Sequence, residues 1–140
     1  DSFEALREYK KNHLESFVIA PHPNHGLVVS LGLKRLKKYA DIFDAIEHSW
    51  YYSKLFNLNR QTAKLAKQLS LPFVATSDVH DLPYLNQDYL EADVSELSTP
   101  ALFAAIKNGK FSNISHPKPF WELVWYQFKM MFAGISSLFK

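Results

Sequence analysis

Along the first third of the chain, segments with apolar residues at helical spacing alternate with short apolar runs. Residues 2–15 carry apolar side chains at helical spacing with charged residues between them, and residues 33–40 repeat that spacing. Short apolar runs cover residues 17–20 and 42–47, and a bounded run of this kind is typical of a buried strand. The pattern therefore predicts two helices and two strands, in the order helix, strand, helix, strand.

Cap and breaker residues set the next boundaries. Asn59 is in a suitable position to cap a helix over residues 60–69, whose apolar residues again follow helical spacing. Pro72 separates this helix from a third apolar run at residues 73–76, because a proline disfavours helix in the residue before it. The sequence thus predicts a helix followed directly by a third strand.

The region after the third strand is less regular. Residues 81–95 are expected to be mostly irregular, with one short strand near 92–94. Ser98 or Thr99 is expected to cap a further helix, which ends close to Gly109 because glycine favours the left-handed conformation found after helices.

The order of these elements predicts the fold class. Strands that alternate with helices favour parallel pairing through right-handed crossovers, so the fold is expected to be α/β. A chain of 140 residues fits one domain, whereas a closed α/β barrel seldom has fewer than about 200 residues. We expect residues 1–119 to form this domain and residues 120–140 to form an amphipathic helix.

The predicted C-terminal helix differs from the rest of the chain in its many aromatic residues. Its apolar positions follow helical spacing and are Trp121, Val124, Trp125, Phe128, Met131, Phe132, Ile135, Leu138 and Phe139. Such a stripe requires a partner. We expect the helix to dock on the domain or on another subunit; a membrane surface is the alternative, which a weakly cationic polar face does not favour.

The composition limits which metal ligands and partners the chain can have. The chain has no cysteine, which excludes disulfides and thiolate metal sites, so a metal would be held by His, Asp and Glu. The net charge of +2 does not indicate nucleic acid, which stays an alternative partner. The sequence shows neither a signal peptide nor an apolar run long enough to cross a bilayer, so a cytoplasmic location is expected. Because it begins at Asp1, the chain is expected to be a fragment or a processed product.

Polar residues stand at the end of each predicted strand. His22 follows the first strand, Glu47 and His48 end the second, and Asp78 and His80 follow the third. The carboxyl ends of parallel strands are where active sites form in α/β folds. Asp78 and His80 would point to one side of an extended segment, and His22 would complete three ligands with an open position for water or substrate.

Each of these residues also has a less specific interpretation. An Asp-x-His triplet can be a turn. Glu47 can be a metal ligand, a solvated charge or, as we slightly favour, an acceptor that orients a ligating imidazole. Asn24 and His25 can contact a phosphate or a metal-bound water, or be ordinary loop residues. The aromatic residues 50–52 can stack on a substrate or pack a loop.

A set of ordered motifs between residues 17 and 115 follows the pattern of a known family. The motifs are Val18-Ile19-Ala20-Pro21-His22-Pro23, Phe43-Asp44-Ala45-Ile46-Glu47, Asn59-Arg60, Ala63-x-x-Ala66, Leu71-Pro72 and Thr76-Ser77-Asp78-Val79-His80. Their order and spacing resemble those of the PHP family, named for polymerase and histidinol phosphatase domains.

This resemblance implies a fold, an activity and a set of ligands. The fold would be part of a distorted (βα)7 TIM-like barrel, and the activity would be hydrolysis of a phosphate ester by metal-activated water. His22, Asp78 and His80 would be ligands of divalent metal ions (Mn, Zn, Fe or Mg), with Glu47, His25 and Asn24 around them. No further catalytic residue is assigned, and the substrate would be a small phosphorylated molecule or a nucleotide.

The resemblance covers only the C-terminal half of the family pattern. The opening His-x-His pair of the family has no counterpart among the six histidines, and its middle ligands are also missing. The chain is therefore expected to be inactive alone and to need the missing N-terminal half. Two alternatives stay open, namely a non-catalytic PHP-like module that binds a partner or membrane, and an amidohydrolase-like metallohydrolase.

Overall fold

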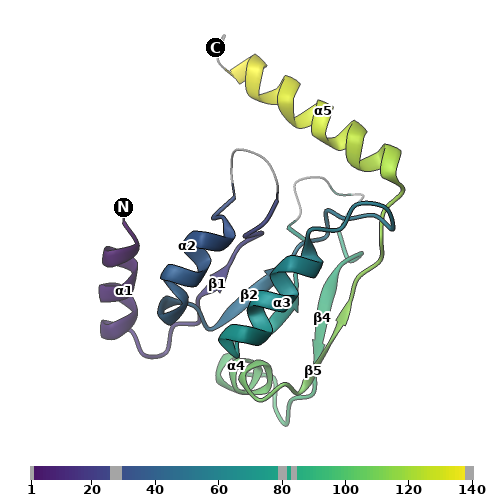
Figure 1. Ribbon diagram of the computed structural model, residues 1–140. Coiled ribbons are helices and arrows are strands. Elements are labelled where there is room, and N and C mark those ends of the chain that lie inside the picture. The colour runs from purple at the N-terminus through teal and green to yellow at the C-terminus, as the bar shows by residue number, and fades with distance from the viewer. Residues whose placement is uncertain (1, 26–29, 79–81, 83–84, 138–140) are drawn as a thin grey trace.

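The computed structural model describes residues 2–25, 30–78, 82 and 85–137, with side chains as far as Lys129 (Figure 1). The elements, in chain order, are α1 (Phe3–Asn12), β1 (Ile19–Ala20), α2 (Leu33–Lys38), the 3-10 helix η1 (Ala40–Ile42), β2 (Ala45–His48), α3 (Asn59–Leu69), β3 (Phe73–Ala75), β4 (Tyr89–Ala92), α4 (Thr99–Lys107), β5 (Phe111–Ile114) and α5 (Phe120–Ser137).

The strands β1, β2 and β3 form a parallel sheet in that order. Ile19 pairs with Ala45, and Glu47 pairs with Val74, so the three strands run in the same direction and their carboxyl ends lie at one edge. This confirms the predicted parallel α/β arrangement. The described strands do not close on one another, so the barrel stays a prediction.

A second sheet corrects the prediction for the region after β3. The short strand expected near residues 92–94 lies at Tyr89–Ala92, and it pairs antiparallel with β5, which was not predicted. The sequence pattern missed β5 because Phe111–Ile114 is four residues long and has two polar residues at its centre.

Asn113 joins the two sheets. Its side chain accepts a hydrogen bond from the Ala75 N–H and donates one to the Phe73 carbonyl, both at 2.8 Å. An amide side chain thereby satisfies the backbone groups at the free edge of β3, which would otherwise need another strand. The β4–β5 pair is therefore fixed beside the parallel sheet without extending its ladder.

The two faces of the parallel sheet pack against different helices. On one face, Ile46 contacts a cluster that includes Leu36 of α2 and Leu65 of α3. On the other face, Ala45 and Val74 pack with Ile106 of α4 and with partly buried residues from β4 and β5. The alternation follows from the two-residue period of a strand, and both faces of β2 are buried as parallel sheets require.

Helix ends agree with the predicted caps, except at α3. The Ser98 hydroxyl accepts a hydrogen bond from the Ala101 N–H at 3.3 Å, and Gly109 has a φ of +69° beyond the end of α4. Asn59 is not the N-cap of α3 but its first residue. Its buried amide instead exchanges two hydrogen bonds with the backbone of Ser49, at 3.0 and 2.7 Å, which fixes the loop after β2 to the start of α3.

Two other helices are shorter than predicted. The helix expected over residues 2–15 ends at Asn12, and the one expected over residues 33–40 ends at Lys38, where η1 begins. The ends of helices are set by local capping and by the packing of the following segment, so apolar spacing alone does not locate them.

The helix α5 confirms the predicted C-terminal helix over residues 120–137. Among the described side chains of α5, Leu123 and Tyr126 are buried, and they pack against Trp50 and Tyr51 from the loop after β2. The predicted apolar stripe does not make this contact, because Leu123 and Tyr126 lie on another side of the helix, and docking of the stripe on another subunit stays a prediction. Among the described helices, none has the length and apolar character needed to cross a membrane.

The carboxylate of Asp44 ties four elements together at the start of β2. It accepts a hydrogen bond from the Val18 N–H at 2.8 Å and lies 2.8 Å from Lys10 Nζ and 3.2 Å from Lys107 Nζ. Burial alone would raise the pKa of Asp44, but the hydrogen bonds from Lys10, Val18 and Lys107 outweigh it and hold the pKa below its ordinary value of 3.8.

We expect Asp44→Asn to lower the free energy of unfolding by about 2 kcal/mol at pH 7, because the variant loses its charge-assisted hydrogen bonds. A lowered carboxyl pKa stabilises the fold above its unfolded value, and this contribution disappears as the pH falls through the folded pKa. Urea unfolding followed by circular dichroism between pH 2 and 7 should show the two proteins converging at low pH. An equal gap at all pH values would contradict this role, and Asp93→Asn, which removes an exposed carboxylate, is the control.

Candidate functional site

The candidate site lies at the carboxyl ends of the three parallel strands. His22 follows β1 after a single proline, Glu47 lies within β2, and Asp78 follows β3. Because β1, β2 and β3 are parallel and adjacent, these ends meet at one edge of the sheet. The structure thus brings together the strand ends on which the sequence places its polar residues.

A short hydrogen bond connects the first two strand ends. The backbone N–H of His22 donates to Glu47 Oε2 at 2.6 Å. His22 lies between two prolines and has a φ of +20°, at the border of the left-handed region that side chains other than glycine seldom adopt. The carboxylate of Glu47 is therefore bonded to the His22 backbone in an unusual conformation, and the predicted role of Glu47 in orienting an imidazole stays a prediction.

Glu47 is a buried carboxylate with unused hydrogen-bonding capacity. Its side chain is 4% exposed, and its Oε1 atom has no hydrogen-bond partner among the described residues. Burial raises the pKa of Glu47, hydrogen bonds from the His22 N–H and from the Thr76 side chain lower it, and the nearby charge of Asp78 makes a smaller contribution that raises it. A buried acceptor without a partner is costly unless a cation or a donor reaches it.

Asp78 has a second unusual backbone conformation. Its φ is +40°, so both predicted ligands that the structure describes lie at or within the left-handed region. Asp78 is close enough to change the pKa of Glu47 on β2 and of His25 in the loop after β1. Strained conformations of this kind cluster at functional sites.

His25 lies next to His22, and Tyr51 covers it. The ring centres of His22 and His25 are 5.6 Å apart in an edge-on arrangement, and those of His25 and Tyr51 are 4.5 Å apart. Burial lowers the pKa of His25, as does the neighbouring His22, while Asp78 raises it. His25 therefore belongs to the same group of interacting side chains as His22, Glu47 and Asp78.

Tyr51 connects this group to the C-terminal helix. Besides contacting His25, its hydroxyl donates a hydrogen bond to the Leu123 carbonyl of α5 at 2.9 Å. The sequence left substrate stacking and loop packing open for residues 50–52. Trp50 and Tyr52 are buried in packing, whereas Tyr51 lies between the site and α5. The sequence pattern of three aromatic residues does not show that Tyr51, the middle one, lies beside the site while the other two pack.

Asn24 and His48 lie away from this group. Asn24 donates hydrogen bonds to the Leu58 carbonyl at 3.4 Å and to Gln61 Oε1 at 3.3 Å, so it fastens its loop to the start of α3. His48 points to the opposite face of the sheet from Glu47, because it is the next residue along the strand, and its ring contacts Tyr52 and Phe73.

The predicted ligand His80 lies outside the described residues, so the trio of His22, Asp78 and His80 stays a prediction. Within the part of the chain that the structure describes, no group of three His, Asp or Glu side chains is arranged to hold a metal ion. The Nδ1 atom of His22 is buried and has no hydrogen-bond partner there, as is the case for Glu47 Oε1. Imidazole and carboxylate donors of this kind fit a divalent metal.

Comparison with known proteins identifies the class of this segment. Residues 57–111 match a family model described as PHP-associated, and this match runs from the loop before α3 to the start of β5. Searches of curated proteins and of solved structures gave no match. The match confirms the predicted family resemblance over residues 57–111, which are less than half of the chain.

Proposed function

We propose that this chain supplies part of the metal centre of a PHP-type phosphoesterase. The observation that carries the proposal is the pair of buried, unpartnered atoms His22 Nδ1 and Glu47 Oε1 at neighbouring strand ends, with Asp78 close by. His22, Asp78 and His80 would hold a divalent metal ion, either Mn, Zn, Fe or Mg, and ligands from outside this chain would complete the centre.

The residues around the metal ligands would have separate roles. A bound divalent metal supplies Lewis acidity, which lowers the pKa of a water molecule and polarises a phosphoryl oxygen. Glu47 would fix the backbone of His22 through the 2.6 Å hydrogen bond and so orient its imidazole. His25, partly buried beside His22 and in contact with Tyr51, would form the wall of the site that limits access of water. The substrate would be a small phosphorylated molecule or a nucleotide.

On this proposal an N-terminal half supplies the remaining ligands, and the decisive experiment compares this chain with a longer form that includes that half. We expect the longer form to bind divalent metal in a stoichiometric amount, measured by elemental analysis, and to hydrolyse p-nitrophenyl phosphate. His80→Ala should lower both the metal content and the rate. A longer protein without metal, in which His80→Ala changes nothing, would refute the proposal, and hydrolysis of amides instead of phosphate esters would indicate an amidohydrolase.

A second candidate is a non-catalytic PHP-like module. It is supported by a family match that covers only the PHP-associated region. On this proposal the protein has no phosphatase activity with any divalent metal, and α5 provides its function by binding a partner. The same comparison of the two forms distinguishes the candidates.

A further inference from the structure

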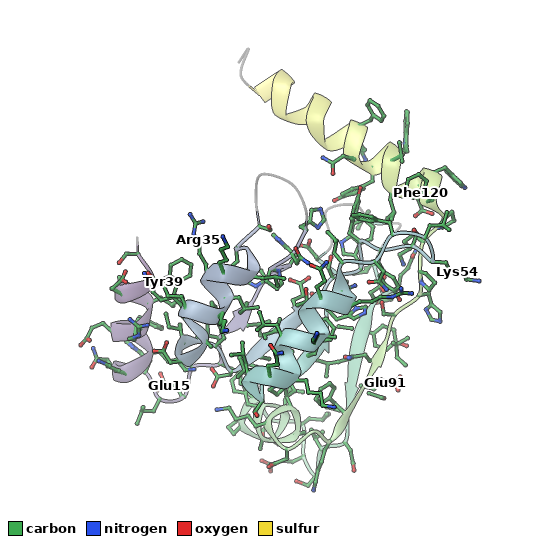
Figure 2. The ribbon with its side chains drawn as sticks, in the orientation of Figure 1. Glu15, Arg35, Tyr39, Lys54, Glu91 and Phe120 are labelled. Carbon is green, nitrogen blue, oxygen red and sulfur yellow. The ribbon has the colours of Figure 1, made fainter. Side chains whose placement is uncertain are left out.

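We infer that the outer face of α5 pairs two copies of this chain in an antiparallel arrangement. We define the aromatic stripe as Trp121, Val124, Trp125 and Phe128, which are 70%, 38%, 68% and 52% exposed. These four residues line an almost wholly apolar hollow of about 640 Å³ on the surface. Figure 2 shows side chains that project from the first turns of α5, where Phe120 is labelled.

The area of the aromatic stripe is close to what a specific dimer needs. Aromatic side chains of this size each bury roughly 150–250 Å², so the exposed part of the stripe is on the order of 500 Å². Pairing two copies would bury about 1,000 Å² in total, the lower bound for a specific interface. The sequence continues the same helical spacing at Met131, Phe132 and Ile135. An apolar patch this large on a soluble protein marks an interaction surface.

The position of the stripe leaves room for a second copy. Leu123 and Tyr126, which fasten α5 to Trp50, lie on the other side of the helix from Phe128 at 100° per residue. Figure 1 shows α5 extending from the sheet, with its C-terminal end away from the other elements. A second helix can therefore cover the stripe without displacing Leu123 and Tyr126 from Trp50 and Tyr51.

Charge placement selects an antiparallel pair of helices. Glu122 and Lys129 both lie along the flank of the stripe beyond Trp125, because they are seven residues apart and thus two turns along one side of the helix. A two-fold axis perpendicular to the helices keeps this flank on one side and reverses its direction. Glu122 of one copy then faces Lys129 of the other, twice per dimer, whereas in a parallel pair the two flanks lie on opposite sides and these charges do not meet.

The same charges do not favour a membrane as the occupant. Helices that lie on membrane surfaces carry several Lys or Arg residues on the polar face. In the part of α5 whose side chains are described, the charged residues are one glutamate and one lysine. A neutral, self-complementary face fits a second copy better than an anionic lipid surface.

Sedimentation velocity of the 140-residue chain between about 1 and 200 μM tests this inference. We expect a monomer–dimer equilibrium, and we expect Trp125→Asp to weaken dimerisation at least tenfold. Leu97→Asp is the matched control, because Leu97 is fully exposed but lies in the loop before α4. Circular dichroism would verify that each variant keeps its helix content.

Charge reversal tests the direction of pairing. Glu122→Lys and Lys129→Glu should each weaken the dimer about fivefold, and the double variant should restore it, since rim ion pairs contribute up to about 1 kcal/mol each. A wild-type chain that stays monomeric at all concentrations would overturn the inference, whether or not it binds vesicles of neutral and anionic lipid. A dimer that Trp125→Asp leaves intact, or that Glu122→Lys does not weaken, would equally overturn it.

Discussion

Replacing Lys118 with alanine is expected to lower the free energy of unfolding by about 3–5 kcal/mol. Lys118 lies just before α5, and its Nζ atom is 2.7 Å from Asp88 Oδ2, with the two side chains 6% and 3% exposed. Truncation would leave the Asp88 carboxylate buried without its cation, which costs far more than the loss of a surface ion pair. Chemical denaturation followed by circular dichroism would measure the change.

The ion pair belongs to a buried network, which is why its loss should destabilise the tertiary structure broadly. The Ser115 hydroxyl donates to Asp88 Oδ1 and contacts the Tyr52 hydroxyl at 3.2 Å. Lys118 Nζ donates to Gln87 Oε1 at 2.9 Å, and its backbone N–H donates to the Tyr52 carbonyl at 2.8 Å. The network therefore joins the loop after β2, the start of β4 and the segment that leads into α5.

Two variants separate the cost of an unpaired charge from a loss of packing. Lys118→Met combined with Asp88→Asn removes both charges at similar volume, so we expect it to be less destabilising than Lys118→Ala alone. Lys110→Ala removes an exposed lysine, and a change within about 0.5 kcal/mol is expected there. If Lys118→Ala costs less than about 1 kcal/mol, the pair does not hold this region together.

Asp78→Asn is expected to reduce kcat/KM by about 100-fold or more in the longer, metal-loaded form of the protein. This prediction rests on the proposed function. Asparagine has nearly the same shape as aspartate and tolerates the φ of +40° about as well, so the substitution should leave the fold intact while removing the negative charge. Loss of metal in the same sample would show that the charge acts as a ligand.

Asp93→Asn provides the comparison for this prediction. Asp93 is an exposed aspartate that follows β4, and its substitution removes one carboxylate of the same type without touching the strand ends. We expect the Asp93 variant to keep wild-type metal content and rate. Full activity together with full metal content in Asp78→Asn would exclude a ligand role for Asp78.

Much of the local structure could be predicted from the sequence. Apolar spacing located the helix at Asn59–Leu69, cap residues located the one at Thr99–Lys107, and short apolar runs located the three parallel strands. Cap residues were informative where the side chain is free to turn back on its own helix, as at Ser98. They were misleading at Asn59, because its buried amide makes two hydrogen bonds with the backbone of Ser49 and so holds the loop after β2 instead of capping α3.

The candidate site was predictable only in outline. Parallel strands bring their carboxyl ends together, so the sequence order of His22, Glu47 and Asp78 was enough to expect them at one edge. The hydrogen bond from the His22 N–H to Glu47 and the position of Tyr51 between His25 and α5 were not predictable. They depend on loop conformations, and no short-range pattern in the sequence determines these.

The sequence by itself determined which segments are helical or extended, because those states depend on the spacing of apolar residues and on local caps. Only the tertiary structure decided which faces are covered. The apolar stripe of the C-terminal helix looked like its docking face, yet Leu123 and Tyr126 make the contact with Trp50 and Tyr51, and Trp121 and Trp125 stay exposed. Burial depends on the surface that a partner presents, and in this chain the partner is a loop more than sixty residues away along the sequence.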